Sequence, residues 1–89
     1  MIDEPEARRR AEELFRCPSD DPERPWSMES FPEGWLVRRS PRPGVRGNAS
    51  YVIERETGRI LGFPSSIAPS RIRDEYSDVI VDGTVVRQN

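Results

Sequence analysis

Apolar residues recur at helical spacing near the start of the chain. Four of them stand at positions i, i+4, i+7 and i+8: Ala7, Ala11, Leu14 and Phe15. This spacing places them on one face of a helix. Asp3 can cap the first turn, and Pro18 ends the pattern because proline cannot continue a helix. We predict a helix over residues 3–16 whose apolar stripe packs against another element, since short helices are marginally stable alone.

Further along the chain the pattern changes to short runs in which successive side chains fall on alternate faces. These runs stand at residues 34–39, 51–56 and 59–63. A period of two is typical of strands that bury one face. Thr57 and Gly58 separate the last two runs and predict a tight turn, because glycine reaches positive φ without steric cost. The three runs together predict an antiparallel meander.

Two segments beside this meander carry weaker patterns. Residues 18–32 are rich in proline and acidic residues, which predicts an irregular connector with a short extended piece at residues 26–28. Residues 70–76 can form a short helix, with Ser70 as its cap.

The end of the chain predicts a second hairpin. Asp82 and Gly83 separate two apolar runs at residues 78–81 and 84–87, and Asp-Gly is a strong hairpin signal. The sequence therefore predicts an α+β fold. An N-terminal helix packs on a small antiparallel sheet of four to five strands, and a short second helix can accompany it.

Length and charge bound the class of protein. Eighty-nine residues form one domain, residues 1–89, whose N-terminus we expect to be flexible. The net charge of −2 argues against a general nucleic-acid binder, which is usually basic. No apolar run approaches membrane-spanning length and no signal-peptide pattern opens the chain, so we expect a cytoplasmic protein without a membrane partner.

The residues that could carry chemistry argue against an enzyme. The chain has no histidine and one cysteine, Cys17, which removes a Cys–His pair, a Ser–His–Asp triad and the usual zinc sites. Glu54 and Glu56 lie on one face of a predicted strand, but an acid–base pair needs a cleft that nothing in the sequence specifies. We expect no catalytic residue, no metal and no cofactor, and interpret the two glutamates as an acidic surface.

Two further features each allow two interpretations. Four arginines surround a loop that contains proline and glycine: Arg38, Arg39, Arg42 and Arg46. They either contact nucleic-acid phosphates or form a solvated or protein-facing charge. Trp26 stands among prolines and acidic residues and lies either in the core or on the surface, where it would be an interface anchor.

Three segments in order carry a family resemblance. They are the Ala- and Arg-rich helix of residues 7–15, the Phe31-x-x-Gly34-Trp35-Leu36 stretch, and the pattern Gly-Asn-x-x-Tyr-Val-Ile-x-Arg-x-Thr-Gly at residues 47–58. This order resembles the immunity protein 35 family, also described as YrhB-type domains. The resemblance covers residues 7–63. Glu54 stands where many relatives have aspartate, and the chain after Phe63 is not matched.

The resemblance implies a binding function. Members look like small cytoplasmic bacterial proteins that are encoded beside polymorphic toxins and neutralise them by binding. The expected partner is a cognate toxin whose active site the protein occludes, as a monomer or a homodimer. Acidic residues and Trp26 would suit a basic toxin surface. The expected contact residues are Asp20, Asp21, Glu23, Trp26, Glu29, Glu33, Glu54 and Glu56.

Two other functions remain open from the sequence. One is a small regulatory or nucleic-acid-binding module that uses the loop arginines Arg38, Arg39, Arg42 and Arg46. The other is a chaperone-like or structural protein without a toxin partner. Gene context separates these functions from the immunity function, because a toxin gene beside this one supports the latter.

Overall fold

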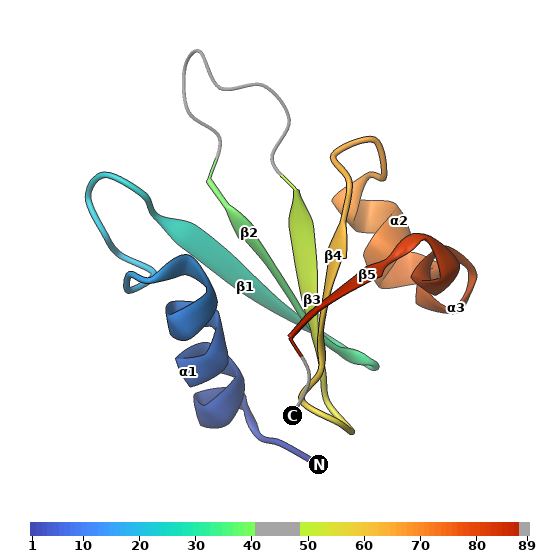
Figure 1. The fold of residues 1–89 in the computed structure, drawn as a ribbon, viewed down its shortest axis with the longest axis horizontal. Helices are drawn as coiled ribbons and strands as arrows, with labels where there is room; N and C mark the ends of the chain where they lie inside the picture. Colours follow the sequence, from blue (N-terminus) through green and yellow to red (C-terminus); the bar gives the residue numbers. More distant parts are fainter. Residues whose placement is uncertain (41–48, 88–89) are drawn as a thin grey trace.

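A five-stranded antiparallel sheet divides the molecule into two helical layers (Figure 1). The computed structural model describes residues 1–40 and 49–87. The strand order β1-β2-β3-β4-β5 follows the chain. The strands are β1 (Trp26–Phe31), β2 (Gly34–Arg39), β3 (Ser50–Glu54), β4 (Ile60–Phe63) and β5 (Thr84–Arg87). The helices are α1 (Glu4–Phe15), α2 (Pro69–Asp74) and α3 (Tyr76–Val79), and a 3₁₀ turn, η1 (Ile80–Asp82), follows. The predicted α+β fold is confirmed.

Helix α1 forms where the apolar spacing predicts it. Asp3 caps it, because the Asp3 carboxylate accepts a hydrogen bond of 3.1 Å from the backbone N–H of Glu6. Ala7, Ala11 and Phe15 are buried against the sheet, which confirms the predicted stripe. The chain before α1 is attached to the sheet as well, since the N–H of Ile2 donates to the carbonyl of Arg55 at 2.9 Å.

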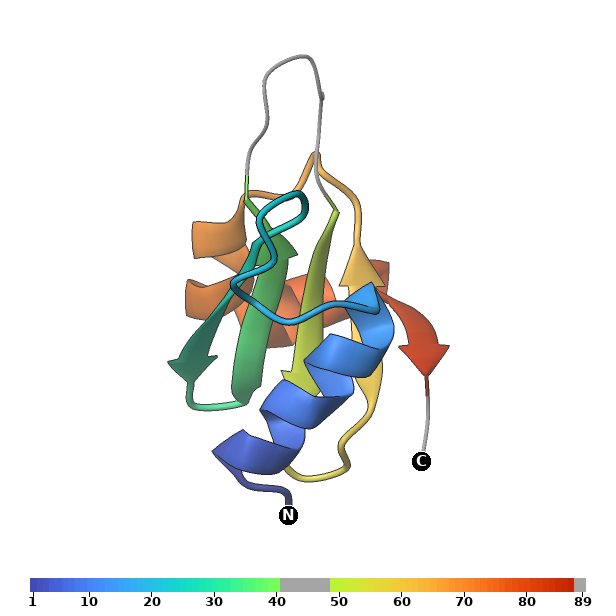
Figure 2. The same ribbon diagram turned by 90° about the vertical axis from the view of Figure 1, so that its left-hand side faces the viewer.

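The two faces of the sheet bury two separate cores. Figure 2 shows α1 in front of the sheet and α2 and α3 behind it. The core under α1 consists of Ala7, Ala11, Phe15, Trp26, Trp35, Val37, Ile53 and Ile60. The core under α2 and α3 consists of Phe31, Leu36, Val52, Leu61, Phe63, Ile67, Ile72, Tyr76 and Val79. Residues of β2 and β3 alternate between the cores as the period of two predicts.

Strand β1 is longer than the extended piece expected in the connector. All six of its residues pair with β2, from Trp26 opposite Arg39 to Phe31 opposite Gly34. Trp26 is only 3% exposed, and its indole N–H donates to the carbonyl of Cys17 at 2.9 Å. Its ring lies 5.4 Å from that of Phe15. Trp26 is therefore a core residue, and its assignment as an exposed anchor is wrong, because the stripe of α1 needs an apolar surface to cover.

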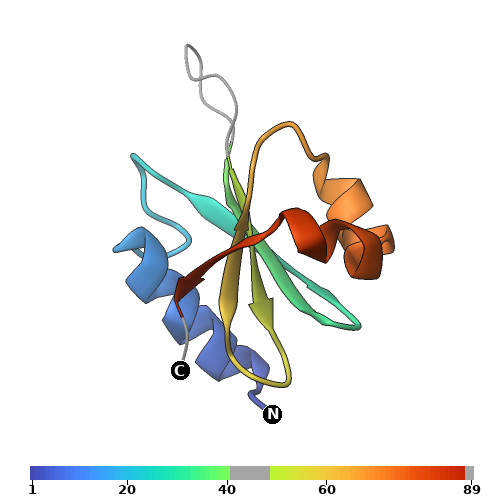
Figure 3. The same cartoon turned by 45° about the vertical axis from the view of Figure 1, so that its right-hand side comes forward.

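The predicted C-terminal hairpin is wrong. Residues 76–82 are helical, and β5 pairs with β4 instead of with residues 78–81. Tyr76 and Val79 are buried in the core under α3, and that burial outweighs the local Asp-Gly turn signal. β5 is an edge strand of the sheet, and Figure 3 shows it following the last helical turn and crossing β4 diagonally. Val85 and Val86 are about half exposed on this edge.

Candidate functional site

Two turns lie together at one end of the sheet. The first joins β1 to β2 through Pro32 and Glu33, and the second joins β3 to β4 through residues 55–59. Gly34 and Glu54 are opposite each other in the register, so the pairing of β2 with β3 brings the turns side by side. The N–H of Arg55 donates to the carbonyl of Glu33 at 3.0 Å and joins them directly.

A pocket of about 450 Å³ opens between these turns and the start of α3. The first turn contributes Pro32 and Glu33. The end of β3 and the second turn contribute Glu54, Arg55, Glu56, Thr57 and Arg59. Tyr76 and Met1 complete the lining. Met1 is 88% exposed and therefore lies at the rim.

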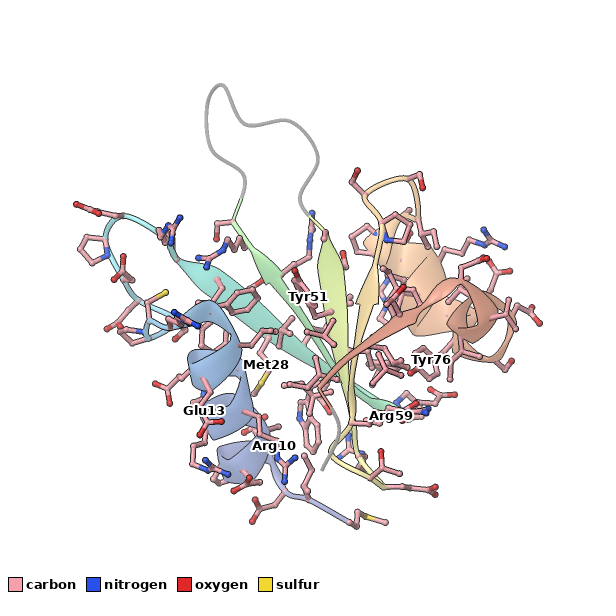
Figure 4. All side chains as sticks on the ribbon, viewed as in Figure 1. Arg10, Glu13, Met28, Tyr51, Arg59 and Tyr76 are labelled. Carbon is pink, nitrogen blue, oxygen red and sulfur yellow. The ribbon has the colours of Figure 1, made fainter. Side chains whose placement is uncertain are left out.

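Glu54 is the centre of a hydrogen-bond network in this pocket. Its carboxylate accepts from Tyr76 Oη at 2.8 Å, from Arg59 Nε at 2.8 Å and from Thr57 Oγ1 at 3.2 Å. Figure 4 shows Tyr76 and Arg59 close together at this end of the sheet. Burial alone would raise the pKa of Glu54, but the hydrogen bonds from Arg59 and Tyr76 outweigh it and hold this pKa below its ordinary value. Burial and the bond to Glu54 raise the pKa of Tyr76.

Replacing Glu54 with glutamine should reduce the acid sensitivity of the fold. Because the pKa of Glu54 is lower in the folded protein, its stabilising effect is complete above the unfolded pKa of about 4.3 and is lost as the pH falls through the folded pKa. The free energy of unfolding should therefore fall less steeply below about pH 4.3 in Glu54→Gln than in the wild type. Urea denaturation across this range measures the slopes. Glu56→Gln is the control, and equal slopes for all three proteins would contradict the expectation.

Arg55 ties the second turn to the first. Its guanidinium lies 4.2 Å from the ring centre of Trp35 and donates to the carbonyl of Phe31 at 3.0 Å and to Ser30 Oγ at 3.1 Å. A guanidinium stacked on an indole and bonded to backbone carbonyls is strongly held. Arg55 thus makes one rigid unit of the two turns.

Gly58 connects the second turn to α1. Its φ of 75° is in the left-handed region that favours glycine, and its N–H donates to the carbonyl of Glu54 at 2.8 Å. The Gly58 carbonyl accepts from Arg10 Nη1 at 3.1 Å, and Arg10 Nε donates to Glu6 at 2.8 Å. The helix, the Gly-Trp stretch and the Arg-x-Thr-Gly turn therefore form one connected structure.

A comparison with protein families covers all three parts of this connected structure. The family model described as the immunity protein 35-like domain matches residues 5–84. The chain belongs to this family. The match of the immunity protein 35-like domain extends past Phe63 to include α2, α3 and the start of β5. Neither the curated proteins nor the solved structures give a match to the chain.

The two titratable groups at the centre of the pocket of this immunity protein 35-like domain are poorly matched to acid–base chemistry. A general acid or base works best when its pKa lies near the working pH. The pKa of Glu54 is lowered and that of Tyr76 is raised, so neither group changes its charge near neutral pH.

Within residues 1–40 and 49–87, no group of three or more Cys, Asp or Glu side chains is placed to hold a metal ion. In the same ranges, no helix is long and apolar enough to cross a membrane.

The predicted acidic contact residues separate into distinct places. Glu33 and Glu56 are exposed on the pocket rim, and no hydrogen bond or ion pair of either side chain is present among the described residues. Glu54 lies inside the pocket. Glu29, in β1, pairs with Arg73 of α2 at 2.7 Å. The structure therefore brings Glu33, Glu54 and Glu56 together and leaves Glu29 apart.

The acidic residues of the connector lie at the opposite end of β1. They are Asp20, Asp21 and Glu23, and the six residues of β1 separate them from the turns by roughly 20 Å. The carboxylate of Asp21 accepts from the N–H groups of Glu23 and Arg24 at 2.9 and 2.8 Å and so stabilises the connector itself. The acidic residues of the connector and those of the turns are therefore too far apart to belong to one compact contact surface.

The described half of the arginine patch does not form a shared surface. Arg39 lies on the α1 side, 4.7 Å from the ring centre of Phe15, and donates to the Phe15 carbonyl at 3.2 Å. Arg38 precedes it in β2 and lies on the α2 side. Arg42 and Arg46 lie outside the described residues.

Sequence reasoning missed the groups that hold the pocket. Arg55 and Arg59 flank the Thr-Gly turn. The position of Arg55 in the family pattern was an available signal, whereas Arg59 directly follows that pattern and carried none. Tyr76 had no such signal, because it follows Glu54 by 22 residues and reaches it only through the packing of α3.

Proposed function

We propose that this immunity protein-like domain neutralises a toxin protein by binding it through the pocket end of the sheet. The observation that carries the proposal is the pair of exposed carboxylates, Glu33 and Glu56, on the rim of a rigid pocket. Two carboxylates without a partner among the described residues favour a cationic surface on the toxin. Such charge complementarity speeds encounter and fixes orientation.

The rigidity of the two turns supports this assignment. Arg55 and Glu54 hold the turns in one arrangement before any partner arrives. A surface that is already ordered loses less conformational entropy on binding. Met1 and Pro32 add an apolar area beside the carboxylates, which gives a partner side chain surface to bury. The pocket end thus combines charge, apolar surface and order.

The proposal extends to the place and mode of action. The toxin domain is encoded beside this gene in a bacterial polymorphic toxin system. The protein acts in the cytoplasm and occludes the active site of the toxin without changing it chemically. Co-expression with the C-terminal domain of the neighbouring gene's product tests this proposal. Restored growth and a stable complex on size-exclusion chromatography support it. Toxicity that persists, with no complex, would reject it.

Charge reversal at the rim should weaken toxin binding. The double variant Glu33→Arg/Glu56→Arg places two cations against a basic surface, and we expect the association rate to fall by about tenfold or more at low salt. Stopped-flow binding at two ionic strengths measures this rate. The matched control is Asp20→Arg/Glu23→Arg, which makes the same charge change at the opposite end of β1. A larger effect of the control would place the contact on the connector instead.

A further inference from the structure

Arg38 differs from every other half-buried arginine of the described residues. Its Nε is buried and has no hydrogen-bond partner, and no hydrogen bond or ion pair of its guanidinium is present in residues 1–40 and 49–87. The other half-buried arginines donate to a carboxylate or a backbone carbonyl: Arg10, Arg39, Arg55, Arg59 and Arg73. A buried donor without an acceptor costs free energy, because it has given up its bonds to water. Such a group in a folded protein needs an explanation.

The surroundings of Arg38 form a small pocket between the sheet and α2. Its volume is about 170 Å³, and Leu36 and Pro69 form its apolar part. Ser27, on β1, is directly opposite Arg38 in the register and also lines the pocket. The pocket has one carboxylate of its own, Glu29, but both of its oxygens accept from Arg73 Nη1, at 2.7 and 3.2 Å. The described residues therefore provide a cationic pocket and leave the Arg38 cation without a counter-charge.

We propose that this pocket receives a carboxylate side chain of the protein partner, with Arg38 as its ligand. The Nε–H and Nη–H groups of a guanidinium match the two oxygens of a carboxylate, and the Ser27 hydroxyl can donate to the same group. That the partner is the toxin rests on the proposed function. The net charge of −2 favours a single carboxylate over a nucleic acid, whose many phosphates are usually bound by a basic surface.

The location of Arg38 fits one interface with the pocket end of the sheet. Arg38 stands four residues after Gly34 in β2, which is roughly 13 Å along the strand. Tyr76, which lines the first pocket, belongs to the helical layer that also carries Arg73 of the second. A partner that places a cation at Glu33 and Glu56 and a carboxylate at Arg38 can dock in one orientation only, because the reversed arrangement opposes like charges.

The variant Arg38→Met tests the proposal on the complex. Methionine keeps an unbranched apolar chain and removes the charge. We expect the affinity for the toxin domain to fall about ten- to hundredfold. The urea midpoint of the free protein should stay the same or rise, since an unpaired buried charge is removed. Arg71→Met on the exposed side of α2 is the matched control and should bind as the wild type does. Wild-type affinity in Arg38→Met would overturn the proposal and leave the proposed function intact.

A second measurement does not need the toxin. The Arg38 Nε–H resonance, assigned by its loss in Arg38→Met, is followed by NMR at constant ionic strength. Sodium acetate should shift it saturably, whereas sodium chloride should not. The absence of an acetate shift would overturn the proposal even where no toxin complex forms. A saturable shift with a short single-stranded oligonucleotide but not with acetate would overturn it in favour of nucleic acid.

Discussion

Replacing Gly34 with alanine should destabilise the protein more than the same substitution at Gly62. A Cβ at position 34 would lie inside the van der Waals distance of the Ile53 carbonyl oxygen and 3.1 Å from Glu54 Cα. Both are backbone atoms of β3, so no side-chain rotation relieves the clash. Strands β2 and β3 would have to separate at this end. We expect a loss of about 3 kcal/mol in the free energy of unfolding, the upper part of the range for overpacking.

Gly62→Ala provides the comparison for that substitution. Its Cβ would meet Val86 Cγ2 at 3.0 Å and Tyr51 Cε1 at 3.3 Å, which are side-chain atoms near the exposed edge. Because these can move, the expected loss is about 1 kcal/mol. Urea denaturation followed by circular dichroism measures both variants. Equal midpoints for Gly34→Ala and the wild type would mean that β2 and β3 do not approach as closely as described.

Replacing Trp26 with alanine should cost about 3–5 kcal/mol of the free energy of unfolding. The indole is 3% exposed, packs on Phe15 and donates a hydrogen bond to Cys17, so truncation leaves a cavity and an unpaired carbonyl. Total stabilities of small domains are about 5–15 kcal/mol, and the variant should therefore be largely unfolded at moderate urea. Thermal and urea denaturation measure the loss.

Two controls separate packing from partner contact at this position. Trp26→Phe keeps an aromatic ring and loses the hydrogen bond, and we expect a smaller loss of about 1–2 kcal/mol. Val81→Ala changes a side chain that is 81% exposed and should alter stability by less than about 0.5 kcal/mol. A Trp26→Ala protein with wild-type stability and no toxin binding would contradict this expectation and assign Trp26 to the interface with the toxin.

Features that depend on local sequence could be predicted. The apolar stripe and the Asp3 cap define α1, and the alternation around Trp35 and Ile53 defines the central strands. The failures have tertiary causes. Trp26 is buried because the stripe of α1 lies over it, and residues 76–82 are helical because Tyr76 and Val79 fill a core on the other face.

The site was predictable only where it overlaps the turns. Glu33, Glu54 and Glu56 gather at one end because the hairpins are adjacent, and acidic composition alone pointed to them. The hydrogen-bond partners of Glu54 lie at different distances along the chain. Tyr76 is distant in sequence and comes close to Glu54 only because α3 packs on the sheet. That Arg38 has no partner among the described residues is visible only when the positions of Glu29 and Arg73 are known.

The strand order has a consequence for the time at which the protein reaches its folded state. Each strand pairs with the one synthesised just before it, so few long loops must close before the sheet forms. Mixed domains of this kind fold in about milliseconds, whereas a ribosome needs roughly 4–18 s to make 89 residues. Synthesis, and not folding, therefore sets the delay before the folded domain is present. Under the proposed function, this domain would be ready to bind its toxin almost as soon as it has left the ribosome.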